Sequence, residues 1–152
     1  MEVKDFLQED SIIKLKASSK KQILQIMSRR AASVTGISEQ EIFDTVLERE
    51  RLGTTGVGNG IAIPHGKLSG LKNMYGVFAC IEKPVAFESV DSRPVDLVFM
   101  LLAPEKSGAD HLKALARVSR LLRDPANCEK LRGTETEDGI YMVLTTAEAK
   151  AA

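Results

Sequence analysis

His65 is the residue whose chemistry stands out, because it closes a glycine-rich segment that runs from Arg49 to Gly66. Four glycines fall between Gly53 and Gly60, and glycine lets the backbone adopt positive φ and approach another group closely. Pro64, just before the histidine, fixes φ and removes a hydrogen-bond donor. Such a segment forfeits helix and strand stability, which indicates a functional segment carried on a rigid scaffold.

An imidazole can act as a nucleophile and form a covalent intermediate. With an ordinary pKa near ~6.5, it is largely neutral at cellular pH and keeps a free lone pair. A phosphoryl acceptor needs in-line access to one ring nitrogen, a partner for the other, and donors for the equatorial oxygens. We expect Arg49 to supply fork-shaped donors, the loop amides to form an anion-binding nest, and Gly66 to clear space for a docked partner. Thr54 and Thr55 are further candidate donors to phosphate, although turn formation explains them equally well.

Each candidate also has a structural interpretation, and residue chemistry alone leaves these alternatives open. His65 can be a loop histidine bonded to a neighbouring carbonyl. His111, the second histidine, falls on the apolar side near the first turn of a predicted helix, and chemistry alone favours a role in satisfying that turn. Arg49 can be a solvated charge that complements the negative end of a helix dipole.

Several other chemistries are disfavoured. The glycine spacing matches neither a P-loop nor a dinucleotide fingerprint, and no zinc-ligand spacing or nucleophilic serine elbow is present. We therefore predict no metal and no cofactor. Lys+Arg and Asp+Glu are both 21, which argues against a general nucleic-acid binder.

The cysteines and the N-terminus bear on the compartment. Cys80 and Cys128 lie in apolar or helical contexts, so we interpret both as reduced and structural in a cytoplasmic protein. The charged N-terminus lacks a signal peptide's apolar core. The longest apolar run, Leu97 to Ala103, is too short to span a bilayer, so we predict no membrane insertion.

Hydrophobic spacing predicts strands interleaved with helices. Residues 66–72 are expected to form a loop, and residues 84–94 a connector with a short strand at 85–87. Strands that are apolar on both faces belong inside a helix-covered sheet, so we predict a single α/β domain over residues 1–152 with a mixed sheet flanked by helices on both faces. Strands are expected at 11–17, 74–81 and 95–103, and helices from Ser18 or Ser19 to Val34, from Ser38 to Leu52, from Asp110 to Arg123, from Asp124-Pro125 to Arg132, and after a capping box at Thr134–Glu137.

The segment from Arg49 to Gly66 closely resembles the active-site signature of the enzyme IIA components of the bacterial phosphoenolpyruvate-dependent phosphotransferase system, in the mannitol/fructose/nitrogen-regulatory class. Residues 94–104 and 111–116 resemble the central strand and second-histidine helix of the same family. The resemblance implies an α/β sandwich with a mixed, roughly five-stranded sheet. It also implies that His65 accepts a phosphoryl group at Nε2 from a phosphohistidine of the small carrier HPr, or of its nitrogen-branch paralogue NPr. His111 and Arg49 match positions expected to stabilise that group.

The resemblance favours the nitrogen-regulatory branch, because the chain has no room for a sugar-specific IIB or IIC module. In that branch the protein is mainly a regulatory phosphohistidine carrier, whose phosphorylation state controls targets such as potassium-transport proteins or sensor kinases. The alternative is a free-standing enzyme IIA that passes phosphate from HPr to a fructose- or mannitol-type IIB. A further alternative is a binding module whose histidine is never modified.

Overall fold

A mixed six-stranded sheet forms the centre of the protein in the computed structural model, which describes residues 1–151 and, at 148–151, the helical backbone only. Parallel pairing joins β1 to β5, and β6 to both β3 and β4, whereas the β5–β6 and β2–β3 pairs are antiparallel. The strand order is β1-β5-β6-β3-β2, with β4 also on β6. The strands are β1 (Leu7–Leu15), β2 (Gly56–Gly58), β3 (Ile61–Ala62), β4 (His65–Leu68), β5 (Tyr75–Val85) and β6 (Val95–Pro104).

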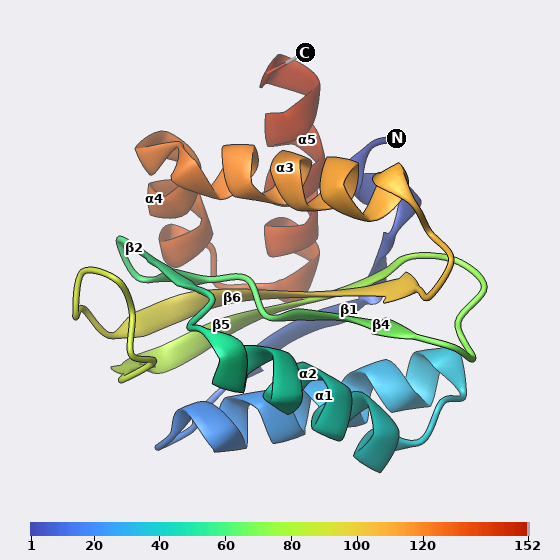
Figure 1. Cartoon of the computed structure of the whole chain (residues 1–152). Coiled ribbons are helices and arrows are strands. Elements are labelled where there is room, and N and C mark those ends of the chain that lie inside the picture. The colour runs from blue at the N-terminus through green and yellow to red at the C-terminus, as the bar shows by residue number, and fades with distance from the viewer. Residues whose placement is uncertain (152) are drawn as a thin grey trace.

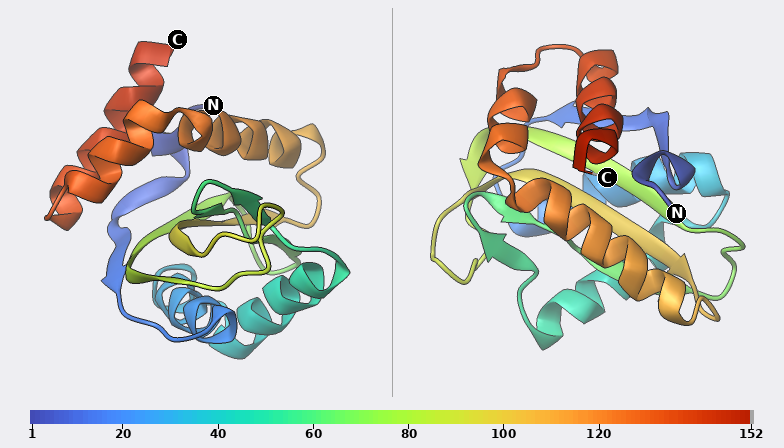
Figure 2. Two further views of the ribbon diagram at one scale, coloured as in Figure 1. Left: turned by 90° about the vertical axis from the view of Figure 1, so that its left-hand side faces the viewer. Right: turned by 90° about the horizontal axis from the view of Figure 1, so that it is seen from above.

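Helices cover both faces of this sheet (Figure 1). α1 (Lys20–Thr35) and α2 (Glu39–Leu52) pack on one face. The other face carries α3 (Ala109–Arg123), α4 (Pro125–Gly133) and α5 (Glu137–Ala151), and the short 3-10 helix η1 (Val3–Asp5) packs beside them. Figure 2 shows the same separation from two further sides. No helix in residues 1–151 is long and apolar enough to cross a membrane.

β5 and β6 are buried because their side chains are apolar on both faces. Along β6, Leu97, Phe99 and Leu101 pack in the core under α3, α4 and α5, while the alternate residues Val98 and Met100 pack in the core under α1 and α2. Alternation with a period of two residues sends successive side chains to opposite layers. The predicted buried strands, and the mixed sheet between two helical layers, are confirmed.

Most helix ends follow the predicted capping residues. Ser19 Oγ accepts from the Gln22 amide at the start of α1, and Ser38 Oγ accepts from the Glu41 amide at the start of α2. Asp124 caps α4, with Pro125 as its first residue. The capping box predicted from Thr134 is wrong: the Gly139 amide donates to Thr136 Oγ1 instead, so α5 begins later.

Four strand predictions differ from the structure in detail. Residues 66–68, expected to be loop, belong to β4, whose backbone pairs with β6 although the segment is too short to show periodicity. The sheet has six strands rather than about five, because the glycine-rich segment contains β2 and β3. β1 begins at Leu7, before a register shift that ends at Ile12, and β5 extends to Val85, two residues into the predicted connector.

Candidate functional site

His65 lies at an edge of the sheet, on a line of backbone that β3, Pro64 and β4 form along β6. The Leu101 amide donates to the Pro64 carbonyl (2.9 Å), and His65 is the register partner of Leu101. Proline is tolerated at a sheet edge, where its missing amide faces no partner strand. The backbone of the histidine is therefore fixed by strand pairing and not by the flexibility of the preceding loop.

The His65 ring is held in one tautomer by its own backbone. Nδ1 lies 2.9 Å from the carbonyl oxygen of Ile63. A carbonyl oxygen can only accept, so Nδ1 carries the proton and Nε2 keeps its lone pair. The contact expected for a structural loop histidine is thus also the contact that prepares Nε2 as a nucleophile.

His111 faces His65 across the space between α3 and β4. The ring centroids are 5.6 Å apart and the planes are inclined by 51°. His111 is the third residue of α3 and 7% exposed, and it follows Gly108, whose φ of 58° turns the chain into the helix. Its Nδ1 has no hydrogen-bond partner among the residues that the structure describes. A buried polar atom without a partner is costly, which is expected where a ligand group completes the site.

Both imidazoles are kept in their neutral form. Burial lowers the pKa of His65, and the charge of Arg49 lowers it further against the opposing effects of the Ile63 carbonyl and Glu50. Burial also lowers the pKa of His111, with smaller contributions from His65 and Lys67. A neutral ring retains the lone pair that a nucleophile requires.

Arg49 lies half-buried in the last turn of α2, where its Nη1 donates to the Gly53 carbonyl (3.0 Å). This bond and its place at the helix C-terminus agree with the structural interpretation. The charge of Arg49 also lowers the pKa of His65, so it acts electrostatically on that ring.

Glu50 anchors the start of the glycine-rich segment and was not predicted from the sequence. Its carboxylate, in a residue 5% exposed, accepts from the Thr55 amide (2.7 Å) and the Thr55 hydroxyl, and pairs with Lys20 Nζ (2.8 Å). Thr54 Oγ1 donates to the Phe87 carbonyl (3.0 Å). Both threonine hydroxyls therefore position the loop in this structure, and a role as phosphate donors would require them to leave these partners.

Gly66 allows β4 to approach α2 closely. A Cβ built at Gly66 would lie 3.0 Å from Thr45 Cγ2 and 3.7 Å from Val46 Cγ2. The space beside this glycine is thus filled by α2, which differs from the expectation that it opens room for a docked partner. His65, one residue earlier, points to the opposite face, toward α3.

Arg132 of α4 holds the tip of the glycine-rich segment, although nothing near it in the sequence indicates this role. Its Nε and Nη2 both donate to the Asp96 carboxylate (2.9 Å each), and Nη2 also donates to the Asn59 carbonyl (2.9 Å). The amides of Asp96 and Leu97 donate to the Gly60 carbonyl. The loop is therefore anchored at both ends, by Glu50 and by Arg132.

Gly60→Ala should destabilise the protein more than Gly36→Ala. Both glycines have left-handed φ, 82° and 79°, a conformation that costs other residues about 1–2 kcal/mol. A Cβ at Gly60 would also lie 2.6 Å from Arg132 Nη2 and 2.8 Å from Asp96 Oδ1, whereas nothing lies within 4 Å of one at Gly36. We expect Gly60→Ala to cost at least about 1 kcal/mol more in urea unfolding. Equal losses would contradict the close packing of Arg132 against the loop.

This geometry agrees with the comparisons with known proteins. Residues 5–147 match the family described as "Phosphoenolpyruvate-dependent sugar phosphotransferase system, EIIA 2". The chain belongs to this family. Its relatives include the "Nitrogen regulatory protein" of Bradyrhizobium diazoefficiens, 52% identical over 153 residues and the full length of both chains. The protein of the same name from Escherichia coli is 42% identical over 131 residues, which are 86% of this chain and 80% of that one.

Solved structures support the same assignment. The structure of nitrogen regulatory protein IIA-Ntr from Neisseria meningitidis superimposes with a TM-score of 0.88 at 30% identity, over 93% of this chain and 97% of that one. This chain is thus similar to nitrogen-regulatory members of the EIIA family along nearly its whole length. It is a phosphotransferase-system component of that kind, with His65 and His111 brought together as the resemblance implied.

Proposed function

We propose that the protein is a regulatory phosphohistidine carrier in which His65 Nε2 accepts a phosphoryl group from the phosphohistidine of HPr or NPr. The observation that carries this proposal is the bond from His65 Nδ1 to the Ile63 carbonyl, which leaves Nε2 as the nucleophilic nitrogen. The neutral ring of His111 beside it, with an unpartnered nitrogen, supports the proposal.

Phosphoryl transfer of this kind exchanges one nitrogen–phosphorus bond for another. The lone pair of His65 Nε2 forms the new bond to phosphorus, while the bond to the carrier's imidazole breaks and its electron pair returns to that ring. Positive charge develops on the His65 ring as the bond forms, and the Nδ1–H bond to Ile63 stabilises it. The chain supplies positioning and electrostatics, with Arg49 and the His111 N–H as donors to the phosphoryl oxygens.

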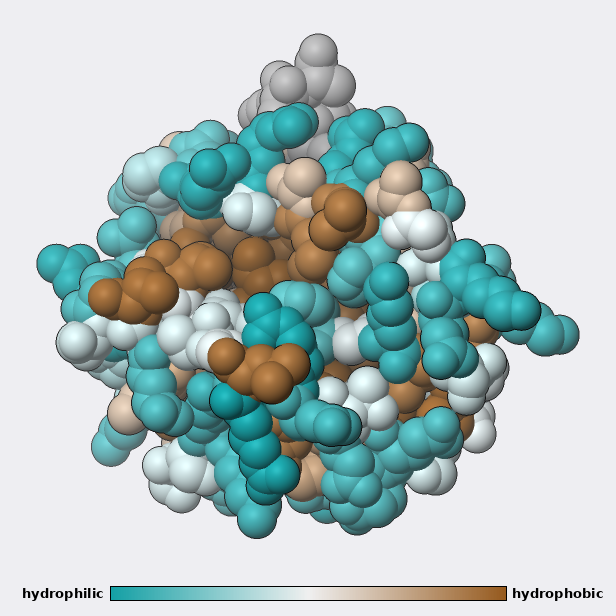
Figure 3. All heavy atoms as spheres, viewed as in Figure 1, coloured by the Kyte–Doolittle hydropathy of each residue, from teal (hydrophilic) through white to brown (hydrophobic). Residues whose placement is uncertain are grey.

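The surface around His65 is suited to docking a carrier. Leu52, three residues after Arg49, is 83% exposed, and Leu112, next to His111, is 67% exposed. Val57 of β2, which lies between these two leucines in the sequence, is also exposed. Figure 3 shows apolar residues, in brown, gathered on the face where α3 and β2 lie. Exposed apolar patches rimmed by polar residues mark protein–protein contacts, so this surface supports transient association with a carrier.

We assign the main role to regulation, because the relatives that are 52% and 42% identical to this chain are nitrogen regulatory proteins. In this proposal the phosphorylation state of His65 controls the binding of targets such as potassium-transport proteins or sensor kinases. Sugar transport is the second candidate. The fructose-specific EIIABC component of Bacillus subtilis is 30% identical over 146 residues, which are 95% of this chain and 23% of that protein.

One experiment tests the proposal and separates the candidates. The chain is incubated with enzyme I, phosphoenolpyruvate and either HPr or NPr, and an acid-labile mass gain of one phosphoryl group is expected. Absence of a gain with both carriers would contradict the proposal. Candidate IIB proteins are then added to the phosphorylated chain. Loss of the phosphoryl group to any of these IIB proteins favours sugar transport, whereas retention of the group in the presence of all of them favours regulation.

The pKa of His65 should lie below that of a free histidine. Burial and the Arg49 charge both disfavour the protonated ring, so an NMR titration should give a midpoint below ~6.5. Arg49→Gln removes one opposing charge and should move that midpoint upward. In the unsubstituted chain, His65 binds protons more readily in the unfolded state than in the folded state at pH values below ~6.5. Its lowered pKa therefore decreases the free energy of unfolding as the pH falls below ~6.5. A midpoint above that of a free histidine would refute the neutral-ring interpretation.

A further inference from the structure

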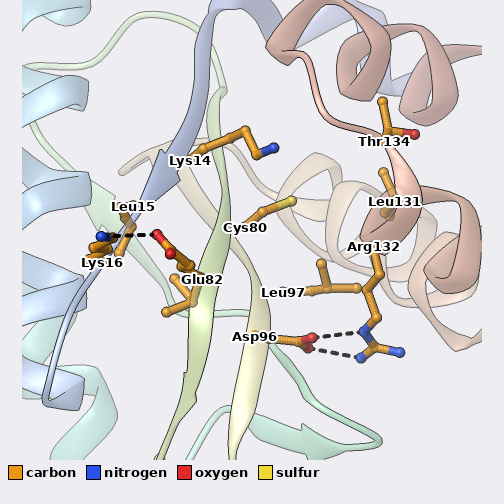
Figure 4. A pocket seen from close by; sticks show the side chains of 11 residues that line it. Lys14, Leu15, Lys16, Cys80, Glu82, Asp96, Leu97, Leu131, Arg132 and Thr134 are labelled. Carbon is orange, nitrogen blue, oxygen red and sulfur yellow. Dashed lines mark hydrogen bonds and ion pairs between the residues drawn. The ribbon is translucent and has the colours of Figure 1, made fainter.

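A cavity lies near the start of β6, away from His65. Its volume is about 480 Å³, and it is lined by residues of β1, β5, β6 and the end of α4 (Figure 4). Small-molecule sites have volumes of about 300–1,000 Å³. Leu97 lines this cavity and is four positions before Leu101, the register partner of His65. At about 3.3 Å per residue, the cavity is separate from the phosphoryl-acceptor site.

The charges around this cavity do not cancel. Arg132 pairs with Asp96 (2.9 Å) and Lys16 pairs with Glu82 (3.6 Å). Lys14 Nζ instead donates to the backbone carbonyl of Glu135 (2.6 Å), a neutral acceptor. Among the residues that the structure describes, the lining therefore holds three cations and two carboxylates. The unmatched ammonium group of Lys14 favours an anion.

The rest of the lining is apolar or neutral. Leu97 and Leu131 contribute apolar surface, and the Cys80 thiol points into the cavity between Lys14 and Leu131 (Figure 4). Burial raises the pKa of Cys80 to about 11, so the thiol is uncharged at neutral pH and does not compensate Lys14. A neutral sulfur beside two leucines suits an apolar group.

We propose that this cavity is a binding site for a small mono-anion with an apolar body, its anionic group on Lys14 and its body against Leu97, Leu131 and the Cys80 thiol. The site goes beyond phosphoryl transfer and does not depend on it. Arg132 connects the two regions, because the residue that forms one wall of the cavity also donates to the Asn59 carbonyl at the tip of the glycine-rich segment. A ligand in the cavity would therefore contact a residue that also holds that tip.

The test uses a pair of probes that differ in charge. 4-Fluorobenzoate is a mono-anion with an apolar ring, and 4-fluorobenzamide is its uncharged counterpart. Fluorine NMR with the full chain should show benzoate binding at low-millimolar concentration, about tenfold more tightly than benzamide, because the carboxylate forms a charge-assisted hydrogen bond. In a separate proton–nitrogen spectrum of the protein, benzoate should shift the backbone amide signals of Cys80 and Leu97, and the shifts should extend to Asn59.

Variants of Lys14 complete the test. Lys14→Met should reduce the affinity for benzoate to that for benzamide, and Lys14→Arg should restore it. Lys21→Met removes another exposed lysine, on α1 and outside the cavity, and should leave binding unchanged. Equal affinity for the two probes, binding to neither, or retention of the preference in Lys14→Met would each overturn the proposal. Folding of every variant is checked by its amide spectrum. If Lys14→Met is unfolded, Lys14→Gln, which also removes the charge, decides the outcome, and retention of the benzoate preference in it overturns the proposal.

Discussion

His65→Ala should abolish the gain of a phosphoryl group in the reaction with enzyme I, phosphoenolpyruvate and carrier. The substitution removes Nε2, the nitrogen whose lone pair the Nδ1–Ile63 bond leaves free. His111 should not replace it as the acceptor, because that residue is only 7% exposed. Intact-mass spectrometry at neutral pH, with a parallel acid-treated sample, measures the modification.

The matched control for this variant is His111→Ala. It keeps His65 but removes the imidazole N–H that donates to the phosphoryl oxygens in the proposed transfer, so modification should still occur, at a rate lower by about 10²-fold. A full phosphoryl gain in His65→Ala would remove the site assignment. Loss of all modification in His111→Ala together with normal modification in His65→Ala would transfer the acceptor role to the second histidine.

Arg49→Ala should slow phosphoryl transfer about 100-fold while changing the free energy of unfolding by no more than about 1 kcal/mol. We expect a large kinetic effect because the charge of Arg49 acts on the His65 ring and, in the proposed transfer, stabilises charge on the phosphoryl oxygens. The effect on stability is small because the half-buried side chain makes one hydrogen bond, to the Gly53 carbonyl. Single-turnover transfer from labelled carrier and a thermal midpoint measure the two quantities.

Arg51→Ala is the control for this prediction. Arg51 lies in the same last turn of α2 and carries the same charge, but it is exposed. It should leave both the transfer rate and the thermal midpoint nearly unchanged. Normal transfer combined with a large loss of stability in Arg49→Ala would show that the arginine only supports the loop.

Sequence patterns predicted the layers of the fold because burial leaves a periodic trace. β5 and β6 were recognisable from apolar residues on both faces, and α3 from its apolar stripe. β4 was missed because four residues that include a glycine carry no period, and only pairing with β6 makes them a strand. Thr136 rather than Thr134 caps α5. The two threonines stand in similar local sequences, so local sequence alone does not distinguish them.

The site was predictable only where its residues are close in the sequence. Gly53 to His65 formed a recognisable segment, and the resemblance added His111. The two anchors of the loop are contacts between distant residues: Glu50 with Lys20, thirty positions earlier, and Arg132 with Asn59, 73 positions earlier. A charged residue at a helix end is usually solvated, so neither Glu50 nor Arg132 showed a local sign of its role.

The central position of β6 determines when the site can form during synthesis. β6 is the last strand to leave the ribosome, yet it lies between β5 on one side and β3 and β4 on the other. Until it inserts, the backbone that carries His65 has no partner strand, and His111 follows later still. Because contacts between distant segments form late in folding, we expect a nascent chain that contains His65 but not β6 to lack the geometry that the proposed phosphoryl transfer requires.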